Sequence, residues 1–390
     1  MKIDARPPAP TGTRAWVRPP QEMSAVVGRW VDATADVLAL DENTLLARHP
    51  DQVRTVLTGR DYLTRGQRPA ALMRAERALL SAAAGEFMLL DLIAVTHAQQ
   101  LATRLEHLAA VGDGADLTAM MDRLVVRVLL EALLGPVDVD EIAAAVAAAS
   151  RVADVPVPPA AARADSYTGV TAAVCAALAR QSPLSRGPVV QRLIDDGHRM
   201  EVIATHLAIL LVDGCDMVAQ ALSWTWISLI SATPVYRQWR QQIQATPALA
   251  RTLTGDLTRE SLRLFPPAWA LARTAASDTR LGQTPVAGGT LVVVSPFVTH
   301  RHPQIWGEQA QRFAPQRARP AHRFAWLPFG AGHLQCVGAA YALWMADVVV
   351  SILGRRVQFH PVTGGDAVLP RFGRVLAAPA FEVEISAKER

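Results

Sequence analysis

Cysteine is scarce in this chain of 390 residues, which contains three: Cys175, Cys215 and Cys336. Their odd number and wide spacing exclude a disulfide framework and a CxxC metal knuckle, and they favour a reducing, intracellular setting. Net charge is also small, because 39 basic residues nearly balance 35 acidic ones and leave +4. So small a charge does not indicate binding to nucleic acid, although it allows a modestly basic docking face.

Long uninterrupted apolar runs are missing as well. The N-terminal segment has no apolar core of the kind that a signal peptide or a membrane anchor needs. The longest apolar stretches, residues 203–212 and 337–353, are too short or too interrupted to span a membrane. We therefore expect a cytoplasmic protein without a membrane segment, in which 51% hydrophobic residues supply a large core and exclude disorder.

Helical periodicity is present over most of the chain. Leu, Val and Met recur at i, i+3 and i+4 spacing from residue 72 to Gly135, where the pair Gly135-Pro136 ends the pattern. Residues 200–232 predict one helix of about 45 Å at 1.5 Å rise per residue, which must cross the whole molecule. Further helices are predicted at residues 51–57, 166–180, 256–265 and 339–355.

Patterns typical of β-strands come late in the chain. A Gly-Gly turn precedes the apolar run 291–294 and predicts a small sheet. Residues 357–362, 374–378 and 381–386 look like hairpin strands. With no internal repeat, the sequence predicts a mainly α (α+β) fold in one domain over residues 1–390, with a mixed N-terminal part at 1–70.

Residues 329–338 are the most informative segment. Here Cys336 directly precedes a predicted apolar helix, where the helix dipole and backbone N–H groups stabilise a thiolate. Neighbouring glycines let the backbone pass close to a flat, bulky object, and a lone thiolate suits haem iron better than zinc, which takes several protein ligands. Without other residues, a glycine turn around a buried free cysteine explains the segment equally well.

The pattern of this segment, FGxGxxxCxG, resembles the cysteine-ligand loop of the cytochrome P450 enzymes of the soluble bacterial type. The resemblance implies the family's fold, with a long central helix over haem b and Cys336 as the metal ligand. It also implies that four neighbouring residues bind the cofactor, namely Phe329, Gly330, Gly332 and Gly338.

Charged residues extend the resemblance. Glu260 and Arg263 match the family's ExxR on a helix, where i, i+3 spacing puts both charges on one face. An isolated pair of this kind is usually solvated, but Arg317 follows in a segment similar to the family's meander. The resemblance implies that these three residues form a structural ion-pair network that holds the proximal haem face.

Two arginines match positions that contact the haem propionates in the family. Arg273 follows Pro266-Pro267 in a strand similar to the one after ExxR, and Arg77 lies in the segment RALLS. Arginine suits such a contact because it binds a carboxylate bidentately. The resemblance covers roughly residue 73 to the C-terminus.

The long helix departs from the family's (A/G)GxDT. Gly214 and Asp216 are present, but Met217 stands where the threonine is usual. In the family the acid and the alcohol deliver protons during oxygen activation, and methionine cannot donate that hydrogen bond. Asp216 remains as a proton relay, and the missing hydroxyl could come from the substrate. Met217 therefore indicates altered oxygen chemistry or, alternatively, a residue that only fills space.

Other positions differ from the family too. Met73 and Leu334 replace basic residues near the propionates, and His333 is a displaced substitute or a surface group. The segment between residue 57 and Arg77 is short, which predicts a wider or partner-closed pocket and a large or carrier-tethered substrate, unless other loops cover the gap. By position alone, the substrate contacts are expected at Val212, Asp213, Ala268, Trp269, Ala270 and Phe372.

The resemblance implies a haem-thiolate monooxygenase that oxidises a small organic molecule in bacterial specialised metabolism. Electrons must come from separate ferredoxin and ferredoxin reductase partners, since the chain shows no flavin or iron–sulfur domain. Arg317, Arg319 and Arg323 could help an acidic partner dock, or form a solvated basic face. Two alternatives remain: a haem-dependent rearrangement, coupling or cyclisation without oxygen insertion, and a non-catalytic auxiliary protein of a biosynthetic enzyme.

Overall fold

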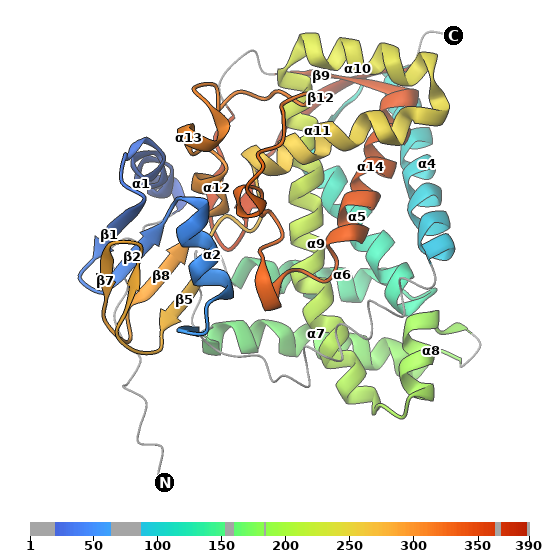
Figure 1. Ribbon diagram of the computed structural model, residues 1–390. Helices are drawn as coiled ribbons and strands as arrows, with labels where there is room; N and C mark the ends of the chain where they lie inside the picture. Colours follow the sequence, from blue (N-terminus) through green and yellow to red (C-terminus); the bar gives the residue numbers. More distant parts are fainter. Residues whose placement is uncertain (1–19, 64–86, 153–159, 183–184, 363–367, 388–390) are drawn as a thin grey trace.

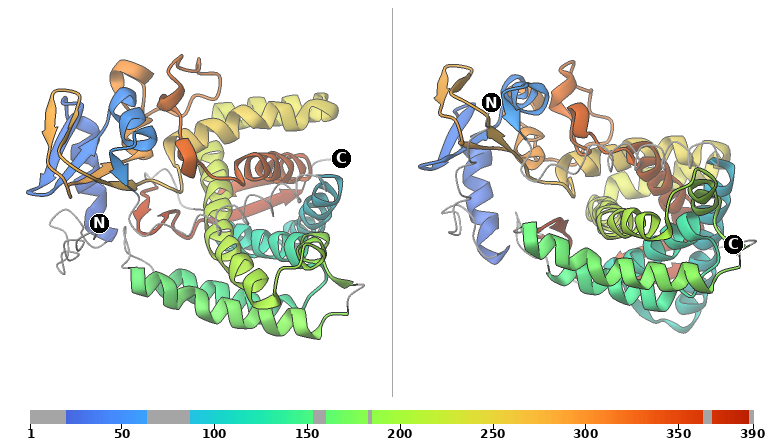
Figure 2. Two further views of the ribbon diagram at one scale, coloured as in Figure 1. Left: turned by 60° about the horizontal axis from the view of Figure 1, so that its bottom comes forward. Right: turned by 90° about the horizontal axis from the view of Figure 1, so that it is seen from below.

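The computed structural model describes residues 20–63, 87–152, 160–182, 185–362 and 368–387. A five-stranded sheet with α1 and α2 forms one end of the molecule, and the remaining long helices form the other (Figures 1 and 2). The helices are α1 Pro20–Asp32, α2 Pro50–Thr58, α4 Phe87–Val111, α5 Leu117–Leu134, α6 Val139–Val152, α7 Ala160–Arg180, α8 Pro188–Asp195, α9 Met200–Ser231, α10 Thr233–Ala245, α11 Ala250–Leu264, α12 Pro296–Thr299, α13 Pro303–Trp306 and α14 Ala339–Arg356.

The helix α9 is the centre of the helical part, as the sequence predicted. It is apolar almost all round, with Trp224 and Trp226 fully buried, which is the pattern of a helix surrounded by protein. Helices α5, α7 and α11 pack against it, and α14 packs against α4 and α11. Among the described helices, α9 alone has the length and hydropathy of a membrane span, and 61% of its most apolar window is buried inside the protein.

The main sheet has the order β1-β2-β8-β5-β3. Its strands are β1 Val37–Asp41, β2 Thr44–Ala47, β8 Leu291–Val294, β5 Leu271–Ala275 and β3 Tyr62–Leu63. Strand β8 pairs with β2 in parallel and with β5 antiparallel. All four residues of β8 are buried, because it is the central strand.

Late strands form the smaller sheets, as expected. These are β6 Thr279–Leu281 with β7 Thr284–Val286, β10 Arg371–Phe372 with β11 Leu376–Ala377, and β12 Glu382–Ala387 between β4 Gly114–Asp116 and β9 Val357–Pro361. Three strands of the main sheet were not expected, since β1, β2 and β3 come from the first 70 residues. Of these, β2 pairs with the distant strand β8, β1 pairs with β2, and β3 pairs with the distant strand β5.

Candidate active site

The loop that carries Cys336 is held against two other elements. Gly332 has φ +75° and would place a Cβ 2.5 Å from the carbonyl oxygen of Leu57 at the end of α2, so only glycine fits there. A Cβ on Gly330, φ +68°, would lie 3.7 Å from Leu271 at the start of β5. The Cys336 amide donates to Phe329 O at 2.9 Å and closes the loop.

Cys336 is the most accessible of the three cysteines. Its side chain is exposed, whereas Cys175 is half-buried and Cys215 is buried. Burial and, to a smaller extent, the charge of Asp122 together raise the pKa of Cys215 to about 12, so this thiol is inert. Cys336 is therefore the cysteine able to meet a ligand.

The Cys336 thiol lies in a recess. Although solvent reaches it, desolvation by the surrounding protein raises its pKa, and the Asp213 carboxylate on α9 raises it further. The N–H of Gly338, the N-cap of α14, lowers the pKa as the sequence analysis expected, but it is outweighed. A stable thiolate at neutral pH thus requires a cation, and Asp213 lies within electrostatic reach of the same recess.

The guanidinium of Arg273 is buried and has few hydrogen-bond partners. It lies on β5 and is 6% exposed. Its Nη1 donates to the adjacent carbonyl of Ala272 at 2.9 Å, and its Nε has no partner. Burial lowers its pKa, and no carboxylate of the described residues forms an ion pair with it. Such a group is costly unless an anion binds it.

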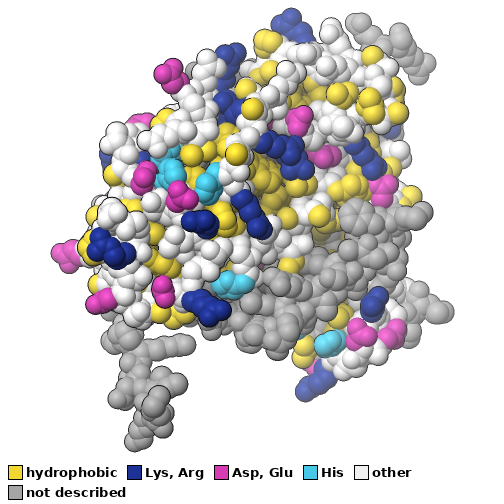
Figure 3. All heavy atoms as spheres, in the orientation of Figure 1, with side chains coloured by type: hydrophobic (Ala, Val, Ile, Leu, Met, Phe, Trp, Pro, Cys, Tyr) yellow, Lys and Arg dark blue, Asp and Glu magenta, His cyan; other side chains and the backbone are white. Residues whose placement is uncertain are grey.

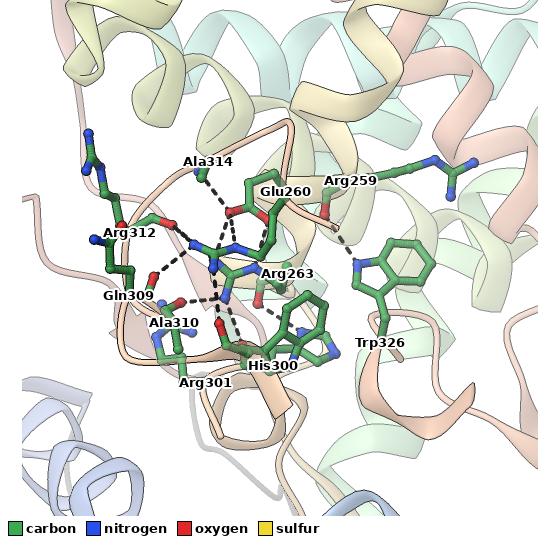
Figure 4. Close-up of polar contacts among 12 residues, drawn as sticks. Arg259, Glu260, Arg263, His300, Arg301, Gln309, Ala310, Arg312, Ala314 and Trp326 are labelled. Carbon is green, nitrogen blue, oxygen red and sulfur yellow. Dashed lines mark hydrogen bonds and ion pairs between the residues drawn. The ribbon is translucent and has the colours of Figure 1, made fainter. Parts of the chain in front are cut away.

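The ExxR pair is completely buried and completely paired (Figure 4). Glu260 binds Arg263 bidentately, at 2.7 Å to Nε and 2.8 Å to Nη2. The remaining N–H groups of Arg263 donate to the carbonyls of His300, Ala310 and Arg312. All five donors are used, which is the condition under which a buried ion pair is tolerated.

Arg317 joins this network from the following loop. Its Nε lies 3.4 Å from Glu260 Oε1, and the same oxygen accepts from the Ala314 amide at 2.9 Å. Its Nη2 also donates to Gln309 O at 2.8 Å. Arg317 is thus engaged with the network, whereas Arg319 and Arg323 are exposed.

His300 links the network to the cysteine loop. The amide of Leu327 donates to its Nε2 at 2.8 Å, so Nε2 is an acceptor and Nδ1 carries the proton that is donated to Arg263 O at 2.9 Å. Burial lowers the pKa of His300 to about 3 and keeps the ring neutral. Sequence reasoning missed this residue, because a lone histidine after an apolar run carries no signal of its own.

On α9, Asp213, Gly214, Asp216 and Met217 are half-buried. Ser150 of α6 donates to Asp216 Oδ1 at 2.9 Å. Both acids contact Arg374 of the β10–β11 turn, which the sequence analysis had not selected. The only signal was its place in the hairpin that was expected to face the pocket.

The remaining expected contacts are distributed differently. Trp269 and Phe372 are buried and pack edge to face, with ring centroids 5.0 Å apart, and Val212 lies in the main core. These three side chains therefore belong to the hydrophobic core, while Ala268 and Ala270 are half-buried.

The other propionate positions are less informative. His333 is exposed in the turn Gly332–Leu334, and Leu334 is half-buried. Arg77, Met73 and the short segment before Arg77 lie outside the described residues.

A crevice elsewhere on the molecule does not coincide with this site. It has a volume of about 310 Å³ and lies between α1 and α13, lined by Asp32, Arg301, His302 and Glu308 among others. Of the residues discussed above, only Ala310, whose carbonyl accepts from Arg263, lines this crevice.

Comparison with known proteins decides the family. The family model described as cytochrome P450 matches residues 192–383, which contain α9, the Glu260–Arg263 pair, Arg273 and the Cys336 loop. The chain belongs to the cytochrome P450 superfamily. The first 191 residues lie outside the match.

Three relatives illustrate this similarity. This P450 is 30% identical to cyclooctatin synthase of Streptomyces melanosporofaciens over 40% of its own length and 37% of the relative. It is 30% identical to cyclooctat-9-en-7-ol 5-monooxygenase of the same organism, over 45% and 40% of the two chains. It is also 31% identical to cytochrome P450 734A5 of Oryza sativa subsp. japonica, over 38% and 30%. The matches thus span about two fifths or less of these relatives.

The family implies a haem cofactor, and the described residues of this P450 fit one. Cys336 offers an accessible thiol whose ionisation needs a cation. Gly332 lets the loop approach α2, and Arg273 on the adjoining strand lacks an anion. A haem brings both the metal cation and carboxylates that would satisfy these groups.

Proposed function

We propose that the protein is a haem-thiolate oxidoreductase in which Cys336 is the axial ligand of haem b. The observation that carries this proposal is the exposed Cys336 thiol, which shares a recess with the acidic face of α9. The oxidised substrate is a small organic molecule. The names of the two Streptomyces relatives, a synthase and a monooxygenase, support an oxidation in bacterial biosynthesis.

Several residues would hold the cofactor. Arg273 and Arg77 would bind the propionates, while Gly330, Gly332 and Gly338 would let the loop lie flat with Phe329 beside Cys336. When bound, the haem would supply an iron that the Cys336 thiolate holds, and thiolate ligation favours O–O cleavage. His333 would be a further propionate contact. The Glu260–Arg263–Arg317 network would hold the Cys336 loop in place.

The acidic face of α9 would manage protons and the substrate. Asp216 would take a proton from solvent on a carboxylate oxygen and pass it toward the recess, a role that Ser150 at 2.9 Å supports. Gly214, which has no side chain, leaves space beside Asp216. Asp213, Ala268 and Ala270 would contact the substrate, with Val212, Trp269 and Phe372 behind them.

Electrons would come from a separate ferredoxin and ferredoxin reductase in the cytoplasm. On the face seen in Figure 3, basic side chains surround a hydrophobic area near the centre, a mixture that suits docking of an acidic partner. Arg319 and Arg323 are exposed, although Arg319 also lies 3.6 Å from Asp256, whereas Arg317 is engaged with Glu260. We also propose that residues 1–390 form one domain.

The spectrum of the reduced protein with carbon monoxide tests the proposal. The thiolate-type Soret band is expected for the unmodified chain and for Cys175→Ser, and it should disappear in Cys336→Ser. Both variants make the same chemical change, but Cys175 is a half-buried residue of α7. Well-folded protein that takes up no haem would refute the proposal and favour the auxiliary, non-catalytic role.

Met217 favours a second candidate, a rearrangement, coupling or cyclisation in which no oxygen is inserted. Its thioether cannot donate a hydrogen bond at the position next to Asp216. Turnover under labelled O₂ distinguishes the two, because label in the product excludes the second candidate. Met217→Thr should change peroxide release or the product distribution; unchanged values would show that this position does not influence oxygen chemistry.

A further inference from the structure

Two carboxylates lie one turn apart on α9, and the first of them, Asp213, is within electrostatic reach of Cys336. Asp213 and Asp216 are three residues apart, so their side chains share one face of the helix. They are 39% and 23% exposed. Two like charges held so close and partly shielded from water repel each other. Their arrangement therefore requires a counter-charge from a neighbouring element.

Arg374 supplies that counter-charge from the turn between β10 and β11. Its Nη1 lies 3.3 Å from Asp213 Oδ1, and its Nη2 contacts Asp216 Oδ2. The side chain is 11% exposed, which separates it from an ordinary solvated surface arginine. Because each terminal nitrogen engages a different carboxylate, one planar guanidinium fixes both acids relative to each other.

The backbone that carries Arg374 is itself fixed. The indole N–H of Trp269 donates to Gly373 O at 2.8 Å, and that of Trp224 donates to Leu376 O at 3.0 Å. These two bonds tie both sides of the turn to buried aromatic residues. Arg374 thus reaches the acids from a rigid base, and it cannot follow a carboxylate that moves away.

Both oxygens of Asp216 have a defined donor. Arg374 engages Oδ2, and Ser150 of α6 donates to Oδ1 at 2.9 Å. Tyr167 of α7 makes the corresponding bond to Asp213 Oδ1 at 3.1 Å. A carboxylate held at both oxygens keeps one orientation, whereas loss of Arg374 would free one oxygen and leave Asp213 to repel it.

We propose that Arg374 is a positioning residue for Asp216, holding this carboxylate in the orientation from which it relays protons. This inference rests on the proposed function, in which Asp216 serves proton delivery. Arg374 acts through Asp216 and has no contact of its own with the reacting atoms. Its removal should therefore slow steps that need a proton and leave haem binding intact.

The experiment uses haem-loaded protein with hydrogen peroxide as the probe and guaiacol as the reporter. Each peroxide is reduced to two waters while two guaiacol molecules each lose one electron and one proton, so no ferredoxin is needed. O–O cleavage requires a proton shift between the peroxide oxygens, which a placed carboxylate assists. Arg374→Gln should lower kcat about tenfold and enlarge the solvent isotope effect, with unchanged KM for guaiacol and an unchanged carbon monoxide spectrum.

Three further variants make the result specific. Arg374→Lys keeps a positive charge but cannot engage the two carboxylates with two separate nitrogens, so its kcat should lie between those of Arg374→Gln and the unmodified protein. Arg280→Gln makes the same change as Arg374→Gln at an exposed arginine of the β6–β7 hairpin, where Nη2 donates to Gln283 O, and should have no effect. In an Asp216→Asn background, Arg374→Gln should change kcat by less than about twofold, because its target is already gone.

A second readout is independent of activity. If Arg374 holds the acids that accept from Ser150 and Tyr167, its loss should speed amide hydrogen exchange in α6 and α7 about fivefold. Exchange in α10, which makes none of these contacts, should not change. Arg280→Gln should leave exchange in all three helices unchanged.

The possible outcomes are distinct. Unchanged kcat in Arg374→Gln overturns the inference, even if exchange in α6 is faster, because Arg374 would then be only structural. A further tenfold loss on top of Asp216→Asn also overturns it, since Arg374 would act by another route. Failure of the unmodified chain to bind haem would instead overturn the proposed function and, with it, the basis of this inference.

Discussion

Arg273→Met should have opposite effects on the protein without haem and on the protein that holds it. The guanidinium is 6% exposed, its Nε has no partner, and its Nη1 reaches only the carbonyl next to it. Without an anion beside it, this buried charge destabilises the folded protein. When a haem propionate binds it, the same charge becomes a contact that retains the cofactor.

The magnitudes follow from the same contacts. Replacing a buried, poorly paired charge by an apolar side chain commonly stabilises a protein by about 1–4 kcal/mol, so haem-free Arg273→Met should gain about 1–3 kcal/mol. A hydrogen bond to a charged group is worth about 1.5–3 kcal/mol, which converts to about a tenfold to 150-fold loss in haem affinity. The two effects have opposite sign, and no general loss of packing produces both.

Two measurements check this prediction. Urea unfolding of haem-free protein gives the change in the free energy of unfolding, and transfer of haem to an acceptor protein gives the release rate. Arg280→Met is the matched control, because Arg280 is an exposed residue of the β6–β7 hairpin that donates only to Gln283 O. The reasoning is refuted if Arg273→Met destabilises the haem-free protein, or if haem leaves both variants at the native rate.

Three other substitutions have defined outcomes. Glu260→Gln leaves the buried Arg263 charge uncompensated and should cost about 3–5 kcal/mol in urea unfolding; a loss below about 1 kcal/mol would contradict this. Burial raises the pKa of Asp347 to about 6, so the folded state binds its proton more tightly than the unfolded state. Its contribution should be full below the unfolded pKa and lost as pH rises through 6, by about 1.4 kcal/mol between pH 5 and 7.5. Asp347→Asn should remove that difference, and an unchanged pH profile would count against it. Gly332→Ala should lower the melting temperature, because its Cβ would lie 2.5 Å from Leu57 O at φ +75°, whereas Gly338→Ala, with its nearest contact at 3.9 Å, should not.

Local pattern was enough to predict α5, α9, α11 and α14, but α1, α6, α8 and α10 were not predicted. The end of α5 at Gly135 and the full length of α9 follow from apolar spacing and from residues that stop a helix. The strands of the N-terminal part were not predicted, because β2 finds its partner β8 almost 250 residues later and the pairing leaves no local signal. The local run 291–294 indicated a strand but not its neighbours.

The residues of the candidate site likewise divide into those that local motifs predicted and those that depend on distant partners. Cys336, Glu260, Arg263 and Arg273 were selected because they occur in motifs of fixed spacing. His300 and Arg374 were missed, because each is defined by partners far away in the sequence, up to 37 residues for His300 and about 160 for Arg374. Only the fold brings those partners together.

One segment connects the two sides of the site. The segment that follows α11 begins next to Arg263, whose carbonyl accepts from His300, contains Trp269, and continues into β5, which carries Arg273. Trp269 holds the turn of Arg374 through its indole N–H, while Ser295 donates to the Trp269 carbonyl at 2.7 Å. The Glu260–Arg263–Arg317 network, Arg273 and the turn that carries Arg374 are therefore all connected to this one segment. Hydrogen bonds to Arg263 O, Trp269 O and the Trp269 indole fix this backbone, and the Cys336 loop meets it where Gly330 approaches Leu271, so the segment helps to set the position of the thiol relative to Arg374 and the acids of α9.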